Sequence, residues 1–149
     1  RYRDMINDED ANAECKTLNV SFSSMLQALG ANDVSGGMQS YTTNYAGEPP
    51  LTEACTQLVI ALSQNTSVVA LSLDGPAELG FAVKDALKLN STLKCLNLRC
   101  CRTSFHANAD VAVAAMLKQN SLQSLTWEID SISSIGFSAI ARALQQNTS

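Results

Sequence analysis

A histidine and three cysteines are the residues of this 149-residue chain that first suggest chemistry. They lie close together in sequence, and their nitrogen and sulfur donors suit Zn²⁺: Cys95, Cys100, Cys101 and His106. Their C-x4-C-C-x4-H spacing differs from the short C-x2–4-C pairs that are typical of structural zinc sites. We therefore predict no metal site. Five cysteines are also an odd number without framework spacing, which favours free thiols over disulfides.

A catalytic function would have to be built around His106, the only histidine available to a serine or cysteine triad. The chain contains neither G-x-S-x-G nor a glycine loop of the kind that holds phosphate, and Gly36-Gly37 open no helix with the required spacing. His106 falls in a short segment between an expected strand and an expected helix, which is typical of a solvated loop residue. We therefore predict that the chain is not an enzyme and binds no cofactor.

Charge and hydropathy exclude further classes of function. A net charge of −4 and a pI near 4.8 give no electrostatic support for binding nucleic acid or an anionic membrane. No run approaches the 18 or so apolar residues of a membrane span, and the start of the chain lacks the apolar segment of a signal peptide. With free thiols, this predicts an intracellular protein, cytoplasmic or nuclear.

Five asparagines mark a repeated pattern that must position any functional side chain. Each ends a segment reading apolar-x-x-small-Leu-x-x-Asn, with Met116 at the small position of the fourth segment, at intervals of 33, 25, 30 and 27 residues: Asn32, Asn65, Asn90, Asn120 and Asn147. Self-similarity at a period of 20–50 residues is the signature of a solenoid. Because asparagine tolerates the left-handed backbone conformation, we expect each one to end a helix and turn the chain into a strand. Three of the four N-x-[ST] sequons fall at these positions, so the repeat explains them without glycosylation.

The elements of the repeat follow from its periodicity. The segments 68–73, 93–98 and 122–127 fit L-x-x-L-x-L, the strand of a leucine-rich repeat. Period-3.6 patterns predict helices over 51–64, 77–89, 108–119 and 133–146, with Thr52 and Ser133 or Ser134 as N-caps. We expect regular repeats over 51–149, as a fragment of a longer array.

The N-terminal part, residues 1–50, is less regular. The segment 15–20 reads as a strand and 23–31 as a helix. A weak, glycine-rich strand is expected over 35–40, followed by a loop over 41–50. We therefore predict one or two degenerate repeats in this part.

These features resemble the ribonuclease-inhibitor class of leucine-rich repeats, on the segments 58–73, 83–101, 113–127 and 135–147. The line from Ala86 to Leu98 is also similar to the repeats of tropomodulin and leiomodin, which bind actin at filament pointed ends. The resemblance implies an α/β solenoid, a right-handed β-α superhelix with short parallel strands on its concave face and helices on its convex face. It also implies a non-catalytic scaffold that binds a protein partner, because such stacks act through extended surfaces.

The side chains expected to face outward from the strands are the predicted partner-binding site. They are Val69, Ser72, Asp74, Lys94, Asn97, Arg99, Gln123, Thr126 and Glu128. The partner is a protein of unidentified kind, actin among the candidates. Five basic residues of one repeat suggest either solvated charge or a patch for an acidic partner: Lys84, Lys88, Lys94, Arg99 and Arg102.

Two narrower functions stay open beside the general one. A tropomodulin-like domain would cap actin pointed ends, which seeded elongation would detect. A GTPase-activating protein of the Ran type shares this repeat class, and a single-turnover GTP hydrolysis assay would detect it.

Overall fold

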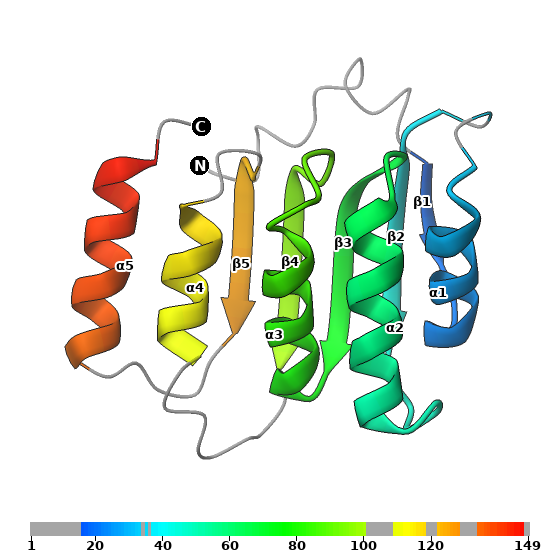
Figure 1. Cartoon of the computed structure of the whole chain (residues 1–149), viewed down its shortest axis with the longest axis horizontal. Coiled ribbons are helices and arrows are strands. Elements are labelled where there is room, and N and C mark those ends of the chain that lie inside the picture. The colour runs from blue at the N-terminus through cyan, green and yellow to red at the C-terminus, as the bar shows by residue number, and fades with distance from the viewer. Residues whose placement is uncertain are drawn as a thin grey trace.

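A computed structural model gives the chain an α/β fold. Strands and helices alternate along the whole of its described part (Figure 1). The structure describes residues 16–33, 35, 37–100, 109–118, 122–128 and 134–147. The elements are β1 (Lys16–Asn19), α1 (Phe22–Ala31), β2 (Gln39–Asn44), α2 (Leu51–Gln64), β3 (Val68–Gly75), α3 (Ala77–Ala86), β4 (Cys95–Cys100), α4 (Ala109–Leu117), β5 (Ser124–Glu128) and α5 (Ser134–Gln146). None of these helices is long and apolar enough to cross a membrane.

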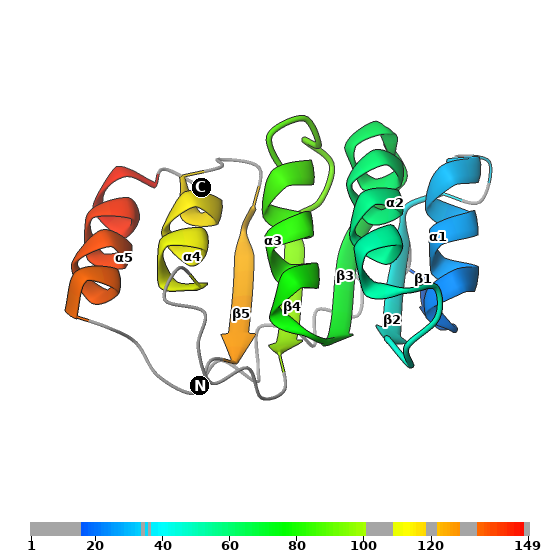
Figure 2. The same cartoon turned by 60° about the horizontal axis from the view of Figure 1, so that its bottom comes forward.

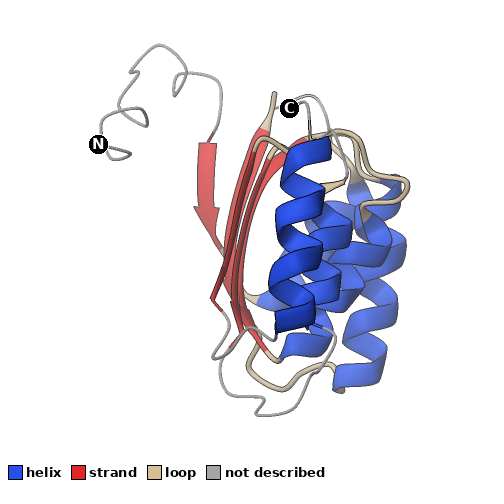
Figure 3. Cartoon of the chain, turned by 90° about the vertical axis from the view of Figure 1, so that its left-hand side faces the viewer, coloured by secondary structure: helices blue, strands red, loops and turns tan. Residues whose placement is uncertain are grey.

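The five strands form one parallel sheet in the order β1-β2-β3-β4-β5, so strands that follow one another in sequence are neighbours in space. The helices stand side by side along the sheet (Figure 2) and lie on one of its faces (Figure 3). We call the other face, which none of the described helices covers, the open face. Because strand side chains alternate, every second residue points into the helix layer and the others point out of the open face.

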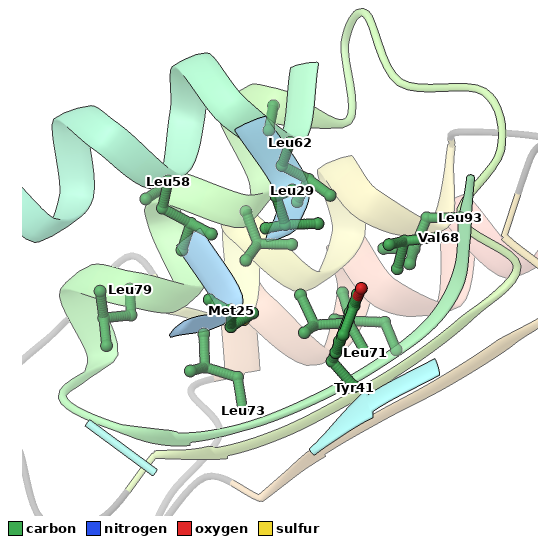
Figure 4. Packing of buried hydrophobic residues seen from close by; sticks show 14 of the residues in the cluster. Met25, Leu29, Tyr41, Leu58, Leu62, Val68, Leu71, Leu73, Leu79 and Leu93 are labelled. Carbon is green, nitrogen blue, oxygen red and sulfur yellow. The ribbon is translucent and has the colours of Figure 1, made fainter. Parts of the chain in front are cut away.

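The core lies between the sheet and the helices and consists mostly of aliphatic side chains (Figure 4). Strand residues in register, such as Leu71 and Leu96, form rows under the helices, and both are 2% exposed. Leu58 and Leu62 of α2 meet these rows from the helix side and are fully buried. The apolar periodicity of each segment thus places one helix face against one strand face.

Most predicted elements are found within a few residues. The helix expected over 51–64 is α2, and those expected over 108–119 and 133–146 are α4 and α5. The helix expected over 77–89 was predicted too long, because α3 ends at Ala86. A turn follows, in which Leu89 N–H donates to the Ala86 carbonyl at 3.0 Å. The prediction of Thr52 as an N-cap was wrong: Pro50 holds that position, and Thr52 lies in the first turn of α2.

The second strand was placed wrongly. We expected a weak strand over 35–40 and a loop over 41–50, but β2 occupies Gln39–Asn44 and pairs with both β1 and β3. Tyr41 and Thr43 supply the inward positions and are each 3% exposed. Aromatic and β-branched residues favour strands, and burial between two neighbouring strands outweighs the lack of a leucine pattern.

Thr43 is the polar exception in this core, and its replacement tests the packing. Its Oγ1 is buried and has no hydrogen-bond partner among the described residues. We expect Thr43→Val, which keeps the shape and removes the hydroxyl, to raise the free energy of unfolding by about 1 kcal/mol. Urea denaturation measures it. Thr42→Val, one residue along on the half-exposed open face, is the matched control and is expected to change stability by less than about 0.5 kcal/mol. A loss of stability in Thr43→Val would contradict the prediction.

Candidate interaction surface

The repeat asparagines hold the turns between helix and strand, but not in the way the sequence suggested. Of the described residues other than glycine, only Asn32 has a left-handed backbone, with φ 47°, whereas Asn65 is extended at φ −76°. Asn65 and Asn90 are instead buried, at 2% and 4% exposure. Their side chains bond the backbone of the turn. Asn120 lies outside the described residues.

Each buried asparagine amide forms hydrogen bonds with backbone groups of the next strand segment and of the preceding repeat. Asn90 Oδ1 accepts the N–H groups of Thr92 at 3.0 Å and Leu93 at 2.9 Å, which start the next strand segment. Its Nδ2 donates to the carbonyl oxygens of Leu62 at 2.7 Å and Asn65 at 3.0 Å. Because buried backbone groups need partners, one side chain here replaces several missing backbone bonds.

The donor half of each amide reaches back by one repeat. Asn65 Nδ2 donates to the Leu29 carbonyl at 3.1 Å, as Asn90 does to that of Leu62, and Asn147 Nδ2 bonds the Leu117 carbonyl. In each case the acceptor leucine stands three residues before the preceding repeat asparagine. At these three described turns the bonds form a ladder that fixes one strand–helix unit on the one before it, and so helps to position the open face.

The open face carries short polar side chains in register. The row through the middle of the strands is Asn19, Thr42, Ser72, Asn97 and Thr126. The row nearer the amino ends of the strands is Ser40, Ala70, Cys95 and Ser124. We call these the middle row and the amino row. All nine side chains are small or medium-sized, and none is Asp, Glu, Lys, Arg or His, so neighbouring strands present short side chains of which most can form hydrogen bonds.

Charge enters at the carboxyl ends of the strands. There Asp74 lies in register with Arg99, so an acidic and a basic residue are neighbours on β3 and β4. Opposite charges on neighbouring strands attract. This carboxyl row gives the open face a polar edge with both signs of charge.

A shallow groove of about 140 Å³ runs over the two uncharged rows between β2 and β5. Asn97 lies in this groove, and its Oδ1 is buried with no hydrogen-bond partner among the described residues. The exposed thiol of Cys95 lies beside it.

The predicted site residues separate into two groups. Ser72, Asp74, Asn97, Arg99, Thr126 and Glu128 take positions in the outward rows of the open face. Val69, Lys94 and Gln123 lie before those rows, where the chain enters the strands. There Lys94 N–H donates to the Val69 carbonyl at 2.8 Å, and Gln123 N–H to the Lys94 carbonyl at 2.8 Å. These three residues therefore belong to the amino edge of the sheet.

The basic residues of one repeat do not form one patch. Lys84 and Lys88 belong to α3 and the turn after it, and both lie close to the Asp85 carboxylate, at 3.3 and 3.1 Å. Burial raises the pKa of Asp85, but hydrogen bonds from Lys88 and Lys84 outweigh it and hold that pKa below its usual value. Arg99 lies on the open face instead, and Arg102 lies outside the described residues.

The residues first considered for chemistry are only partly within the described structure. Cys95 is exposed on the open face, whereas the Cys100 side chain, Cys101 and His106 lie outside the described part. Within that part, no group of three or more histidine, cysteine or acidic residues is placed to hold a metal ion. The half-buried thiol of Cys55 has its pKa raised by burial and by the nearby Glu78, which lowers its reactivity.

One surface feature was missed by the sequence analysis. A groove of about 600 Å³ lies between α1 and α2, lined by residues that include Leu26, Ile60 and Gln64. Ile60 is 56% exposed. Ile60 is apolar but does not belong to the buried helix face that includes Leu58 and Leu62. This exposed apolar position could have indicated the groove from the sequence.

A scan of the sequence against models of protein families finds no match, and neither does a search of curated proteins. The class is therefore defined by the fold and the surface themselves. The described chain is an α/β array of strand–helix units on a parallel sheet, with helices on one face and polar rows on the other.

Proposed function

We propose that this chain is a leucine-rich-repeat module that binds a protein partner on its open face. The proposal is supported by three repeated features: L-x-x-L-x-L strand segments, one helix after each strand, and an asparagine bonded one repeat back. Arrays of this type hold their strands at fixed spacing and use the sheet as a binding surface.

The observation that carries the binding function is the open face itself. Its middle row places five polar side chains in register across five strands, and none of the described helices lies over it. A sheet face of this area is usually covered by a second layer when it has no binding role. The row has no large aromatic anchor, so we expect an extended contact of modest affinity in which hydrogen bonds provide specificity.

The partner's chemistry follows from the groups that would meet it. Ser72, Asn97 and Thr126 line the groove with side chains that donate and accept hydrogen bonds, and the carboxyl row adds Asp74 and Arg99, one charge of each sign. A polar protein surface or an extended segment fits these requirements. A nucleic acid would meet Asp74 on a surface without a basic groove, and an enzyme substrate would meet no described nucleophile-and-base pair.

A paired substitution tests this function. We expect Asn97→Arg with Thr126→Arg, which fills the middle row with long charged side chains, to weaken partner binding at least about tenfold. Gln57→Arg with Gln64→Arg adds the same charge to exposed positions of α2 and is the matched control. Crosslinking in cell extract, followed by mass spectrometry, compares the wild type with both variants.

The supporting result is a protein captured by the wild type and the α2 control but lost from the open-face variant. Affinity measured with that purified protein must then show the same order. If every captured protein is retained by the open-face variant, the open face is not the binding surface. Circular dichroism of each variant establishes that the fold is retained.

A further inference from the structure

The groove between α1 and α2 lies on the other side of the sheet from the open face. It has a volume of about 600 Å³ and separates two helices that stand side by side in the helix layer (Figure 1). Its apolar lining includes the buried Leu26, the half-buried Ala61 and the exposed Ile60. We call this surface the helix groove. Because described helices flank it on both sides, a further strand–helix unit at either end of the sheet would not fill it.

A long connection between strand and helix forms one wall of the helix groove. Residues 45–50 connect β2 to α2, whereas a single residue connects β3 to α3. Glu48 and Pro49 of this connection line the groove. Tyr45 holds the connection in place, because its hydroxyl donates to the Pro49 carbonyl and its ring packs edge-on against Phe22 of α1, with 5.1 Å between the ring centroids. The wall is thus formed before a ligand arrives.

Ile60 differs from the residues that the other repeats place at its position. It stands five residues before Asn65. The residues five before the other repeat asparagines are Gln27, Asp85, Ala115 and Arg142. None of these is a large apolar residue, and the Ile60 side chain is 56% exposed. The packing of the repeat therefore does not account for Ile60, whereas an apolar contact with a group bound in the groove does.

Gly30 leaves the helix groove open on the α1 side. It lies within α1, its φ is not positive, and a Cβ added to it would meet no atom within 4 Å. Alanine is normally preferred to glycine within a helix, so the backbone of α1 does not require glycine here. A larger side chain at this position is therefore expected to enter the groove without disturbing the fold.

The part of the chain that forms the helix groove is acidic. All residues that line it fall within residues 17–83, which contain neither lysine nor arginine but five acidic residues: Asp33, Glu48, Glu53, Asp74 and Glu78. Among the described residues that line the groove, Glu48 alone is charged, and it is exposed. Glu53 lies one turn before Gln57 of the groove and accepts from its Nε2 at 2.7 Å. A cationic group over the groove therefore meets carboxylates and no competing cation from this part of the chain.

We propose that the helix groove binds a segment of a partner protein that carries an aliphatic or aromatic side chain close to a lysine or arginine. The apolar side chain would contact Leu26, Ile60 and Ala61, and the basic side chain would pair with Glu48. Exposed glutamine amides in the lining can donate and accept hydrogen bonds with the backbone of the segment. A nucleic acid or an anionic membrane would instead face like charge. The inference does not depend on the proposed function of the open face.

A random phage-displayed library of peptides of about twelve residues is the probe that tests this proposal. We expect selection on the wild type to enrich peptides that combine an aliphatic or aromatic residue with a nearby lysine or arginine. Synthetic peptides of the enriched sequences are then titrated by fluorescence polarisation. Gly30→Arg fills the groove with a long cation, and Gly30→Ala, which adds only a methyl group, is the matched control. Binding to Gly30→Arg is expected to be at least about tenfold weaker, and binding to Gly30→Ala unchanged.

A second pair of variants tests the charge separately from the shape. Glu48→Gln removes the carboxylate at the groove, and Asp74→Asn removes one from the open face. We expect Glu48→Gln to weaken binding about threefold at low salt and less at high salt, because screening reduces the contribution of an exposed ion pair. Asp74→Asn is expected to leave binding unchanged.

The arginine variants of the open-face experiment locate the peptides on the molecule. Gln57→Arg with Gln64→Arg lies in the helix groove and is expected to lose the peptides, which provides a second blocking variant beside Gly30→Arg. Asn97→Arg with Thr126→Arg is expected to bind them like the wild type. Circular dichroism establishes that each variant is folded.

Four results would overturn the proposal. The first is a selection that enriches no sequence, or only sequences without lysine or arginine. The second is equal binding of the enriched peptides to the wild type and to both groove variants. The third is loss of binding in Asn97→Arg with Thr126→Arg alone, which would place the peptides on the open face. The fourth is self-association of the wild type that Gly30→Arg abolishes, which would make a second copy of this chain the occupant.

Discussion

Replacing Asn90 with alanine is expected to lower the free energy of unfolding by about 4 kcal/mol, the largest effect of any single polar substitution predicted for this chain. The side chain accepts from Thr92 and Leu93 N–H and donates to the Leu62 and Asn65 carbonyls, at 2.7 to 3.0 Å. Alanine leaves these four backbone groups without that partner in a site that is 4% exposed. Each unsatisfied buried group costs about 1–3 kcal/mol, and partial entry of water reduces the sum.

Urea denaturation followed by circular dichroism measures this change. Ser91→Ala, at the next residue, is the matched control, because Ser91 is exposed and contributes its backbone carbonyl to Lys94 Nζ. It is expected to alter stability by less than about 0.5 kcal/mol. A loss of under about 1 kcal/mol in Asn90→Ala would show that water replaces the amide and that the ladder contributes little.

Gly80→Ala is expected to destabilise the protein by about 2 kcal/mol, although alanine normally stabilises a helix interior relative to glycine. A Cβ at Gly80 would lie 2.8 Å from Trp127 Cζ2 and 3.1 Å from Cη2. The indole is rigid and sits between α3 and β5, where its ring also packs edge-on against Phe81. The added methyl group must therefore push the two elements apart.

The same substitution made in a Trp127→Leu background separates this clash from the helix propensity. Leucine at position 127 continues the row of Leu73 and Leu98 and leaves space over Gly80. We expect Gly80→Ala to stabilise that background by up to about 1 kcal/mol. A double-mutant cycle in urea gives the coupling between the two sites. Equal effects of Gly80→Ala in both backgrounds would refute the contact as the cause.

The sequence predicted the strand–helix alternation well because each repeat carries its own local signals. Leu58 and Leu62 on one face of α2, with Leu71 and Leu73 in the following strand, define element type, direction and burial without reference to the rest of the chain. The position of β2 was predicted wrongly because its segment lacks these local signals. Its buried residues are Tyr41 and Thr43, whose strand conformation depends on pairing with β1 and β3 rather than on a local leucine pattern.

The candidate surface was predictable only in part. Alternation correctly assigned Ser72, Asn97 and Thr126 to one outward row, because a strand has a fixed period of two. Simple alternation does not decide the direction of Val69, because the register between β2 and β3 shifts next to that residue. The role of the asparagines was also beyond local reasoning. Asn65 and Asn90 were expected to adopt an unusual backbone, whereas their side chains bond carbonyls 36 and 28 residues away.

The one-repeat reach of those bonds has a consequence for how the molecule unfolds. A side chain that links only adjacent units acts as a nearest-neighbour coupling, so the array behaves as a short one-dimensional chain of cooperating units. Each unit is then as stable as the neighbours that hold its turn. A substitution that removes the amide bonds of one turn is therefore expected to lower the stability of the adjacent units as well as its own.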